Sequence, residues 1–145
     1  MHSVGLDITV IAEEVNGHKR LFMQFNNGKI GFYQNASTGT TALTLFYFWH
    51  KRIEEHNPSL IFIDEFDAFY HQELSEFIVR QLKELDCQVI LTTHNTRLLN
   101  NHLMRPDCCF ILKNGRLATL AYLTNKELRE AHNIEKMYRA KVFDK

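Results

Sequence analysis

The feature that most constrains the fold of this chain is a short apolar run that ends in two acids. Leu60 to Ile63 are all apolar, and Asp64 and Glu65 follow directly. Such a run predicts a strand buried on both faces, as in parallel sheets. Ligands bind at the carboxyl ends of such strands, where adjacent carboxylates are costly unless a cation or a reaction uses them. A solvated strand end fits the run equally well, so the choice between it and a site for Mg²⁺ and water depends on the other motifs in the chain.

A second strand is expected beside the first. A helix with one apolar face follows His71, and the apolar segment Gln88 to Leu91 then ends in Thr92, Thr93 and His94. Two strands joined by one helix predict a right-handed parallel βαβ unit, with His94 one unit away from Asp64. The helix is expected to bury a stripe made of Leu74, Phe77, Ile78, Leu82 and Leu85.

Three Asn-Gly dipeptides predict hairpin turns, because both residue types tolerate positive φ. They are Asn16-Gly17, Asn27-Gly28 and Asn114-Gly115. The first two predict an antiparallel meander, and the third predicts a hairpin near the C-terminus. The strands expected around the turns are Asp7–Val15, His18–Phe25, Lys29–Tyr33, Cys108–Leu112 and Arg116–Leu120.

Two further helices are expected. The first opens at Ala36 to Thr40 and ends before Pro58. Apolar side chains surround it, so we expect burial on more than one side; they are Ala42, Leu43, Leu45, Phe46, Tyr47, Phe48, Trp49 and Ile53. The second is expected from the capping-box spacing of Thr124 and Glu127 through about Ala140.

Length and composition point to one α/β domain. The chain has 145 residues, with a β-rich segment 1–34, a core 35–112 and a C-terminal hairpin and helix 113–145. The formal net charge is zero, so no basic field favours nucleic acid or a membrane surface. No apolar run is long enough to span a membrane, and the start is not a signal peptide. Three cysteines without zinc-type spacing are expected to be reduced core thiols of a cytoplasmic protein.

Three motifs, taken in order, resemble those of ABC-type ATPases. The turn Ser37, Thr38 and Gly39 resembles the signature motif, Asp64-Glu65 resembles Walker B, and His94 resembles the switch histidine. The closest resemblance is to the recombination- and defence-associated branch of AAA-family ATP-binding proteins, which includes relatives of SMC proteins. It spans about Asn35 to Leu112. The implied fold is a partial P-loop NTPase core, with parallel strands flanked by helices and hairpins at both ends.

The resemblance implies a role for each motif. Ser37, Thr38 and Gly39 would contact the γ-phosphate of ATP held by the other protomer, at a helix N-terminus that favours anions. Asp64 would hold Mg²⁺ through water, Glu65 would activate the attacking water, and His94 would reach the γ-phosphate. Asp67 and His71 lie where the family has its D-loop. Without these motifs, Ser37 is a helix cap and Gly39 a tight turn.

The chain departs from the family pattern at several positions. Thr38 and Thr40 stand where transporters have glycine and glutamine, and Phe66 replaces the proline that usually follows the acid pair.

The phosphate-binding loop is missing from the sequence. No Gly-x-x-x-x-Gly-Lys-Ser/Thr occurs, and the only Gly-Lys pair is Gly28-Lys29. The chain therefore resembles the C-terminal half of an ATPase that uses ATP and Mg²⁺ and is inactive alone. A Walker A-bearing N-terminal segment or second protomer would complete it, as a homodimer, with an effector or nuclease as a further expected partner.

Two other functions remain open at this stage. The chain could be a non-catalytic dimerisation or regulatory module that keeps the ATPase fold. It could also be a metal nuclease that uses Asp64, Glu65, Asp67 and His71, because such acids bind two metals. The nuclease ranks lower, since it leaves the turn at Ser37 and the position of His94 unexplained.

Overall fold

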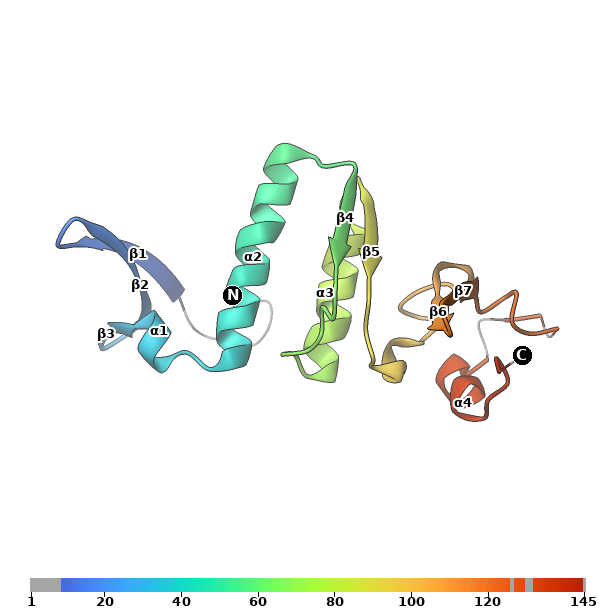
Figure 1. Ribbon diagram of the computed structural model, residues 1–145. Helices are drawn as coiled ribbons and strands as arrows, with labels where there is room; N and C mark the ends of the chain where they lie inside the picture. Colours follow the sequence, from blue (N-terminus) through green and yellow to red (C-terminus); the bar gives the residue numbers. More distant parts are fainter. Residues whose placement is uncertain (1–8, 126, 130–131, 145) are drawn as a thin grey trace. The chain divides into compact units, whose positions relative to one another are not determined.

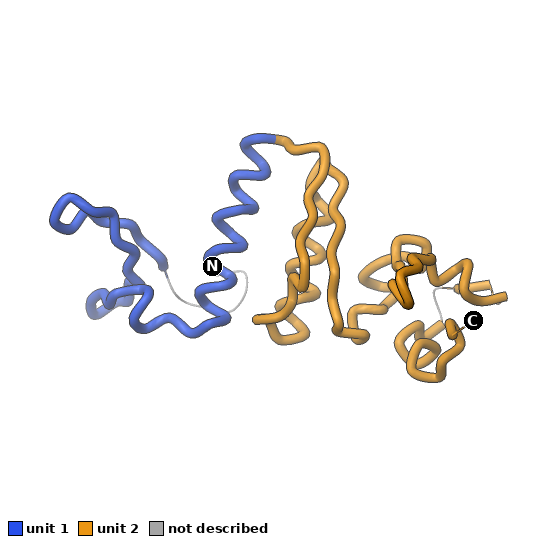
Figure 2. Tube along the Cα trace, in the orientation of Figure 1, with its two compact units in different colours: residues 1–56 blue, residues 57–145 orange. Residues whose placement is uncertain are grey.

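The computed structural model describes residues 9–125, 127–129 and 132–144. The chain forms two compact units, Met1–His56 and Asn57–Lys145 (Figure 2). Both units combine helices with small sheets, so the expected mixed α/β class is correct.

The first unit contains the predicted antiparallel meander. Its strands are β1 (Thr9–Val15), β2 (His18–Phe25) and β3 (Gly28–Gly31), which pair in that order (Figure 1). The first turn is as expected, with φ of 54° at Asn16 and 76° at Gly17. The second turn lies one residue earlier than predicted, at Asn26 and Asn27, because Phe25 pairs directly with Gly28. Asp7, the expected start of β1, lies outside the described residues.

The third strand is shorter than predicted. It ends at Gly31, and Tyr33 belongs to the short helix α1 (Phe32–Asn35) instead of to the strand. Burial of Phe32 and a hydrogen bond from Asn35 Nδ2 to the Gly31 carbonyl stabilise this turn of helix over continued strand pairing.

Helix α2 (Thr38–His56) forms where predicted, but the prediction that it is buried on more than one side is wrong. Leu43 is its one buried residue. Leu45, Tyr47, Phe48 and Trp49 each leave about half of their surface exposed. Within the first unit, no described element covers these side chains, so this apolar surface is exposed.

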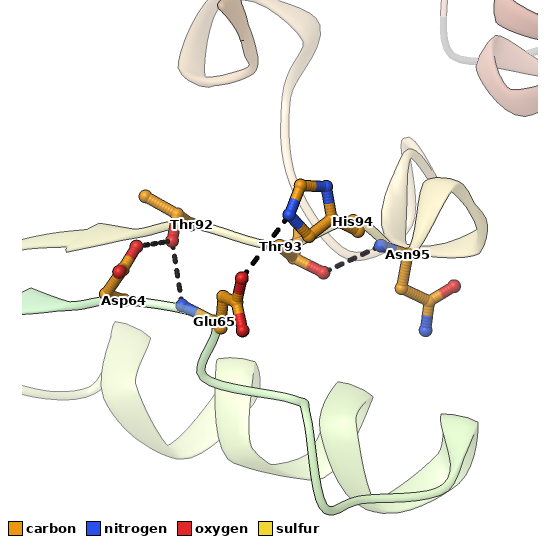
Figure 3. Close-up of polar contacts among 6 residues, drawn as sticks. All are labelled: Asp64, Glu65, Thr92, Thr93, His94 and Asn95. Atoms are coloured by element: carbon orange, nitrogen blue, oxygen red, sulfur yellow. Dashed lines mark hydrogen bonds and ion pairs between the residues drawn. The ribbon is translucent and has the colours of Figure 1, made fainter.

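The second unit contains the predicted parallel strand pair. Strands β4 (Leu60–Ile63) and β5 (Gln88–Leu91) run parallel, with Ile63 beside Leu91. They are joined by α3 (Gln72–Lys83), which lies alongside them in Figures 1 and 3. Five α3 residues are buried, namely Leu74, Ser75, Ile78, Val79 and Leu82. Of the expected stripe, Phe77 and Leu85 are only half-buried.

The prediction that β4 is buried on both faces is wrong. Alternate residues Ile61 and Ile63 are half-buried. Leu60 and Phe62 point the other way, with 51% and 61% of their surface exposed. Ile90, the neighbour of Phe62 on β5, is also exposed. The strand pair is therefore covered on one face only, and its other face leaves apolar side chains exposed.

The rest of the second unit packs around a small core. Two 3₁₀ turns, η2 (Thr96–Leu98) and η3 (Pro106–Cys108), precede the hairpin of β6 (Phe110–Lys113) and β7 (Arg116–Thr119). This hairpin turns at Asn114 and Gly115 as predicted, with φ of 51° and 71°. The core consists of Leu120, Ile134 and Phe143, with partly buried neighbours around it.

The last helix is shorter than predicted. Helix α4 covers Ile134–Arg139, and Asn133 caps it by accepting a 2.8 Å hydrogen bond from the Lys136 amide. The expected start at Thr124 is wrong, although residues 126, 130 and 131 within that stretch lie outside the described part. Asn101 Nδ2 donates hydrogen bonds to the carbonyls of Arg129 (3.0 Å) and His132 (2.9 Å). These bonds tie the two carbonyls to the segment that follows η2, where they compete with the backbone hydrogen bonds of a helix.

The cysteines are free thiols, but the prediction that all three lie in the core is wrong, because Cys108 is exposed and Cys87 is half-buried. Cys109 is half-buried and packs against the small core. Within the described residues, no helix combines the length and apolarity needed to cross a bilayer.

Candidate functional site

Two strand ends meet at the site. Asp64 and Glu65 follow β4, and Thr92 and the residues after it follow β5, so the parallel register places Asp64 opposite Thr92 (Figure 3). Backbone hydrogen bonds continue past the strands, from Thr92 N to Ile63 O (3.0 Å) and from Phe66 N to Thr92 O (3.2 Å). Phe66 is buried, and a proline at its position could not donate that second bond.

Thr92 links both acids through its hydroxyl group. Thr92 Oγ1 donates a short hydrogen bond to Asp64 Oδ1 and accepts one from the Glu65 amide at 2.8 Å. The sequence did not single out Thr92 as a site residue. Its only signal was its place at the end of a strand expected to lie beside Asp64.

Glu65 and His94 form the centre of the site. Glu65 Oε1 lies 3.5 Å from His94 Nε2, which makes an ion pair when the imidazole is protonated. The Glu65 and His94 side chains are 61% and 91% exposed, so the contact itself contributes little to stability, about 0–1 kcal/mol. Glu65 also has φ of 45°, a left-handed conformation that costs a residue with a Cβ about 1–2 kcal/mol. Backbone strain of this kind concentrates at functional sites.

The loop that carries His94 is held by Asn95. The Asn95 amide donates to Thr93 Oγ1 (2.9 Å), and its side-chain Nδ2 donates to Gln72 Oε1 (2.9 Å). Gln72 in turn donates to Glu76 Oε1 at 2.7 Å. The first turn of α3 thus anchors the loop beside the acids, while the imidazole stays exposed.

Asp67 and His71 are not joined to this cluster. His71 caps α3 through Nδ1, which accepts from the Leu74 amide at 3.3 Å. Asp67 is half-buried, and its carbonyl accepts from Tyr70 N at 3.1 Å. Among the described residues, no hydrogen bond or ion pair connects either side chain to Asp64, Glu65 or His94.

The nuclease alternative finds no support in this arrangement. It requires several acids and a histidine around a metal ion. In the part of the chain that the structure describes, no group of three or more His, Cys, Asp or Glu side chains could hold a metal ion.

The turn at Ser37 lies in the first unit. Ser37 Oγ accepts from the Thr40 amide at 3.1 Å and lies 2.9 Å from Thr40 Oγ1, so Ser37 caps α2. Thr38 and Gly39 are the first two residues of the helix, so Gly39 is not in a tight turn. The cap does not exclude a phosphate contact, because the remaining amides of the first helical turn still point outward.

The fold and this pair of strand ends define a mixed α/β protein, and the family match assigns it an AAA domain, with ATPase-like function in general. The chain belongs to the family described as "AAA domain, putative AbiEii toxin, Type IV TA system", whose model matches residues 10–100. The match includes the Ser37 turn, the acid pair and His94. No curated protein matches the chain. The expected AAA family is therefore confirmed, and the narrower ABC- and SMC-like assignment stays a prediction.

Proposed function

We propose that this chain supplies the cation-binding and water-activating part of a Mg²⁺-dependent ATP hydrolysis site. The observation that supports the proposal most strongly is the 3.5 Å contact between Glu65 and His94, next to Asp64 at the ends of two parallel strands. The site is exposed, so it is accessible to a nucleotide held by another segment or chain.

Asp64 fits Mg²⁺ as a single protein ligand. Mg²⁺ prefers oxygen ligands, keeps several waters and is held by one or two carboxylates together with substrate phosphates. Thr92 occupies Asp64 Oδ1, and Oδ2 is a second oxygen for a hydrated cation. The lack of a three-residue metal cluster among the described residues agrees with a nucleotide-borne ion better than with a protein-only cage. When bound, Mg²⁺ neutralises charge on the phosphates.

Glu65 and His94 have complementary tasks in the proposal. The Glu65 carboxylate takes a proton from the attacking water, and His94 orients that water and donates a hydrogen bond to the γ-phosphate. Their contact keeps the base and the imidazole on the same side of the strand ends.

A phosphate-binding lysine must come from elsewhere. Lys29, the one lysine that follows a glycine, lies in β3, pairs with Glu13 and sits 5.0 Å from the Phe22 ring centre. We therefore propose that a Walker A-bearing segment or a second protomer completes the site. In a homodimer of the completed protein, Ser37, Thr38 and Gly39 would contact the partner-bound γ-phosphate, and Asp67 and His71 would border the nucleotide.

A second candidate is a non-catalytic dimerisation or regulatory module. The exposed apolar side chains of α2, with Trp49 and Tyr47 among them, favour it because such surfaces mark interaction sites. This candidate predicts that Glu65 has no catalytic role and is only an exposed surface residue.

Substitution of the two acids separates these candidates. The protein is assayed with a phosphate-loop segment from another family member fused to its N-terminus. Glu65→Gln removes the base but spares the cation contact, so ATP stays bound while hydrolysis slows at least about a hundredfold. Asp64→Asn weakens Mg²⁺-dependent ATP binding itself. Filter binding and phosphate release measure the two effects, and equal loss of binding in both variants would contradict the assigned roles.

A further inference from the structure

We propose that Thr92 is a positioning residue that fixes both acids of the site at once. The inference rests on the proposed function, because it concerns how Asp64 and Glu65 are held for a cation and a water molecule. Neither the family match nor the motifs point to this residue.

The hydroxyl of Thr92 makes two bonds of opposite polarity. A threonine hydroxyl has one proton to donate and lone pairs to accept with. Its proton goes to Asp64 Oδ1, and a lone pair takes the Glu65 amide proton at 2.8 Å. The Thr92 side chain, just after β5, therefore holds both the Asp64 carboxylate and the Glu65 backbone amide, which lie just after β4. The dashed lines in Figure 3 show these two bonds.

Thr92 is itself a fixed anchor. Its amide donates to Ile63 O at 3.0 Å, and its carbonyl accepts from Phe66 N at 3.2 Å. The residue is half-buried, and the Phe66 that it binds is buried. The backbone on either side of the acid pair is thus tied to the same residue whose hydroxyl holds the pair.

The bonds to Thr92 stabilise an unfavourable conformation at Glu65. Its φ of 45° is rare for a residue with a Cβ, and only surrounding contacts maintain it. The Glu65 amide would lose its partner without the Thr92 hydroxyl, and the Asp64 carboxylate could rotate. Hydrogen-bond partners that orient metal ligands typically change affinity 10- to 100-fold when removed.

Thr93 provides a matched control. Its hydroxyl also accepts an amide hydrogen bond, from Asn95 at 2.9 Å, but among the described residues it makes no hydrogen bond to either acid. Removing it should disturb the His94 loop and leave the acid pair in place.

The test compares Thr92→Val, Thr92→Ser and Thr93→Val in the full chain. Mn²⁺ serves as the probe, with affinity measured by electron paramagnetic resonance, and amide hydrogen exchange is followed by NMR. Thr92→Val should weaken Mn²⁺ binding about tenfold and speed exchange of the Glu65 amide, because both hydrogen bonds are lost. Thr92→Ser should stay within about twofold of the wild type on both measures, and so should Thr93→Val.

The inference would be overturned if Thr92→Val changed neither the Mn²⁺ affinity nor the rate of hydrogen exchange at the Glu65 amide. If the chain without nucleotide holds no Mn²⁺, as a nucleotide-borne ion allows, the Glu65 exchange rate alone decides: faster exchange in Thr92→Val supports the inference, and unchanged exchange overturns it. The proposed function is tested separately, by the effect of Glu65→Gln on ATP turnover in the fused protein. If Thr92→Val does not fold, the deciding measurement is the rate at which the Thr92 hydroxyl proton of the wild-type protein exchanges with solvent. Slow exchange with solvent supports the two bonds, and exchange at the rate of a free hydroxyl contradicts them.

Discussion

Glu65 has the least ordinary backbone and one of the most exposed side chains of the site. Its amide is bonded to Thr92, while among the described residues its carboxylate lies within ion-pair distance of His94 alone, at 3.5 Å. This carboxylate is 61% exposed, so water and a nucleotide can both reach it. The same exposure means that the site needs a bound nucleotide or a partner to exclude water.

The adjacent cysteines give a prediction about single residues. Burial, with smaller contributions from the charges of Cys108 and Asp107, raises the pKa of Cys109 to about 11. The thiolate is the nucleophile, so at pH 8.5 roughly 0.3% of Cys109 can react. Iodoacetamide should therefore label exposed Cys108 first, with Cys109 at least about tenfold slower.

Fragment-ion mass spectrometry resolves the two thiols, and a urea-unfolded sample, in which both react alike, is the control. Equal labelling of both cysteines in the folded chain would show that Cys109 is not shielded.

The raised pKa of Cys109 also makes folding stability depend on pH. Because native Cys109 keeps its proton while the unfolded thiol loses it, the stability of the folded chain should fall as the pH rises from about 9 toward 11.

Sequence reasoning identified some residues of the site and missed others for physical reasons. The positions of Asp64, Glu65 and His94 follow from strand ends in a parallel pair, which a βαβ pattern predicts. Thr92 was missed because its role depends on the register between β4 and β5, which the pattern alone does not fix. The imidazole of His71 caps α3, a role that the sequence did not predict, and its contact with a nucleotide stays a prediction.

At the scale of elements, the question is whether Ser37 does more than cap α2, and the first step is to measure the cap's contribution to stability. Ser37→Ala removes the bond to the Thr40 amide and should lower stability by about 1 kcal/mol. Urea denaturation followed by circular dichroism measures this loss. Ser37→Thr keeps a hydroxyl group, so its loss of stability should be smaller than that of Ser37→Ala.

The phosphate role is separated from the cap by Ser37→Arg in the completed protein. Bulk at the helix start should block ATP-driven dimerisation, seen by size-exclusion chromatography, while Ser37→Ala should leave dimerisation largely intact. If the two variants dimerise equally well with ATP, the turn is only a cap.

Element types were more predictable than their burial or their ends. The turns at Asn16-Gly17 and Asn114-Gly115 and the two long helices follow from local sequence, since turn chemistry and helical spacing are local properties. Helix α4 begins later than its capping-box pattern suggested, because Asn101 binds the carbonyls of Arg129 and His132 from a distant part of the chain. The exposed faces of β4 and α2 likewise depend on what is present to cover them.

At the scale of the whole molecule, exposed apolar surface predicts self-association. Leu45 and Trp49 lie four residues apart on one side of α2 and are each more than half exposed. Burying them between two copies would remove apolar area from water, at about 25 cal/mol per Å². We expect dimers or larger species in light scattering, shifted toward monomer by the double substitution Leu45→Gln and Trp49→Gln.

A matched control is Tyr122→Gln, which also removes an exposed aromatic side chain but lies in the other unit. A monodisperse wild-type monomer over a wide concentration range would mean that the apolar face of α2 is tolerated in water.

The central claim is that this chain holds one part of an ATP hydrolysis site and lacks the phosphate loop. The most direct measurement is ATP turnover by the chain alone, by a phosphate-loop segment of another family member alone, and by the two together. We predict that each part alone matches the buffer control, and that the combination hydrolyses ATP with Mg²⁺ and loses this activity in Glu65→Gln. Turnover by the chain alone, or turnover by the combination that is unaffected by Glu65→Gln, would contradict the account.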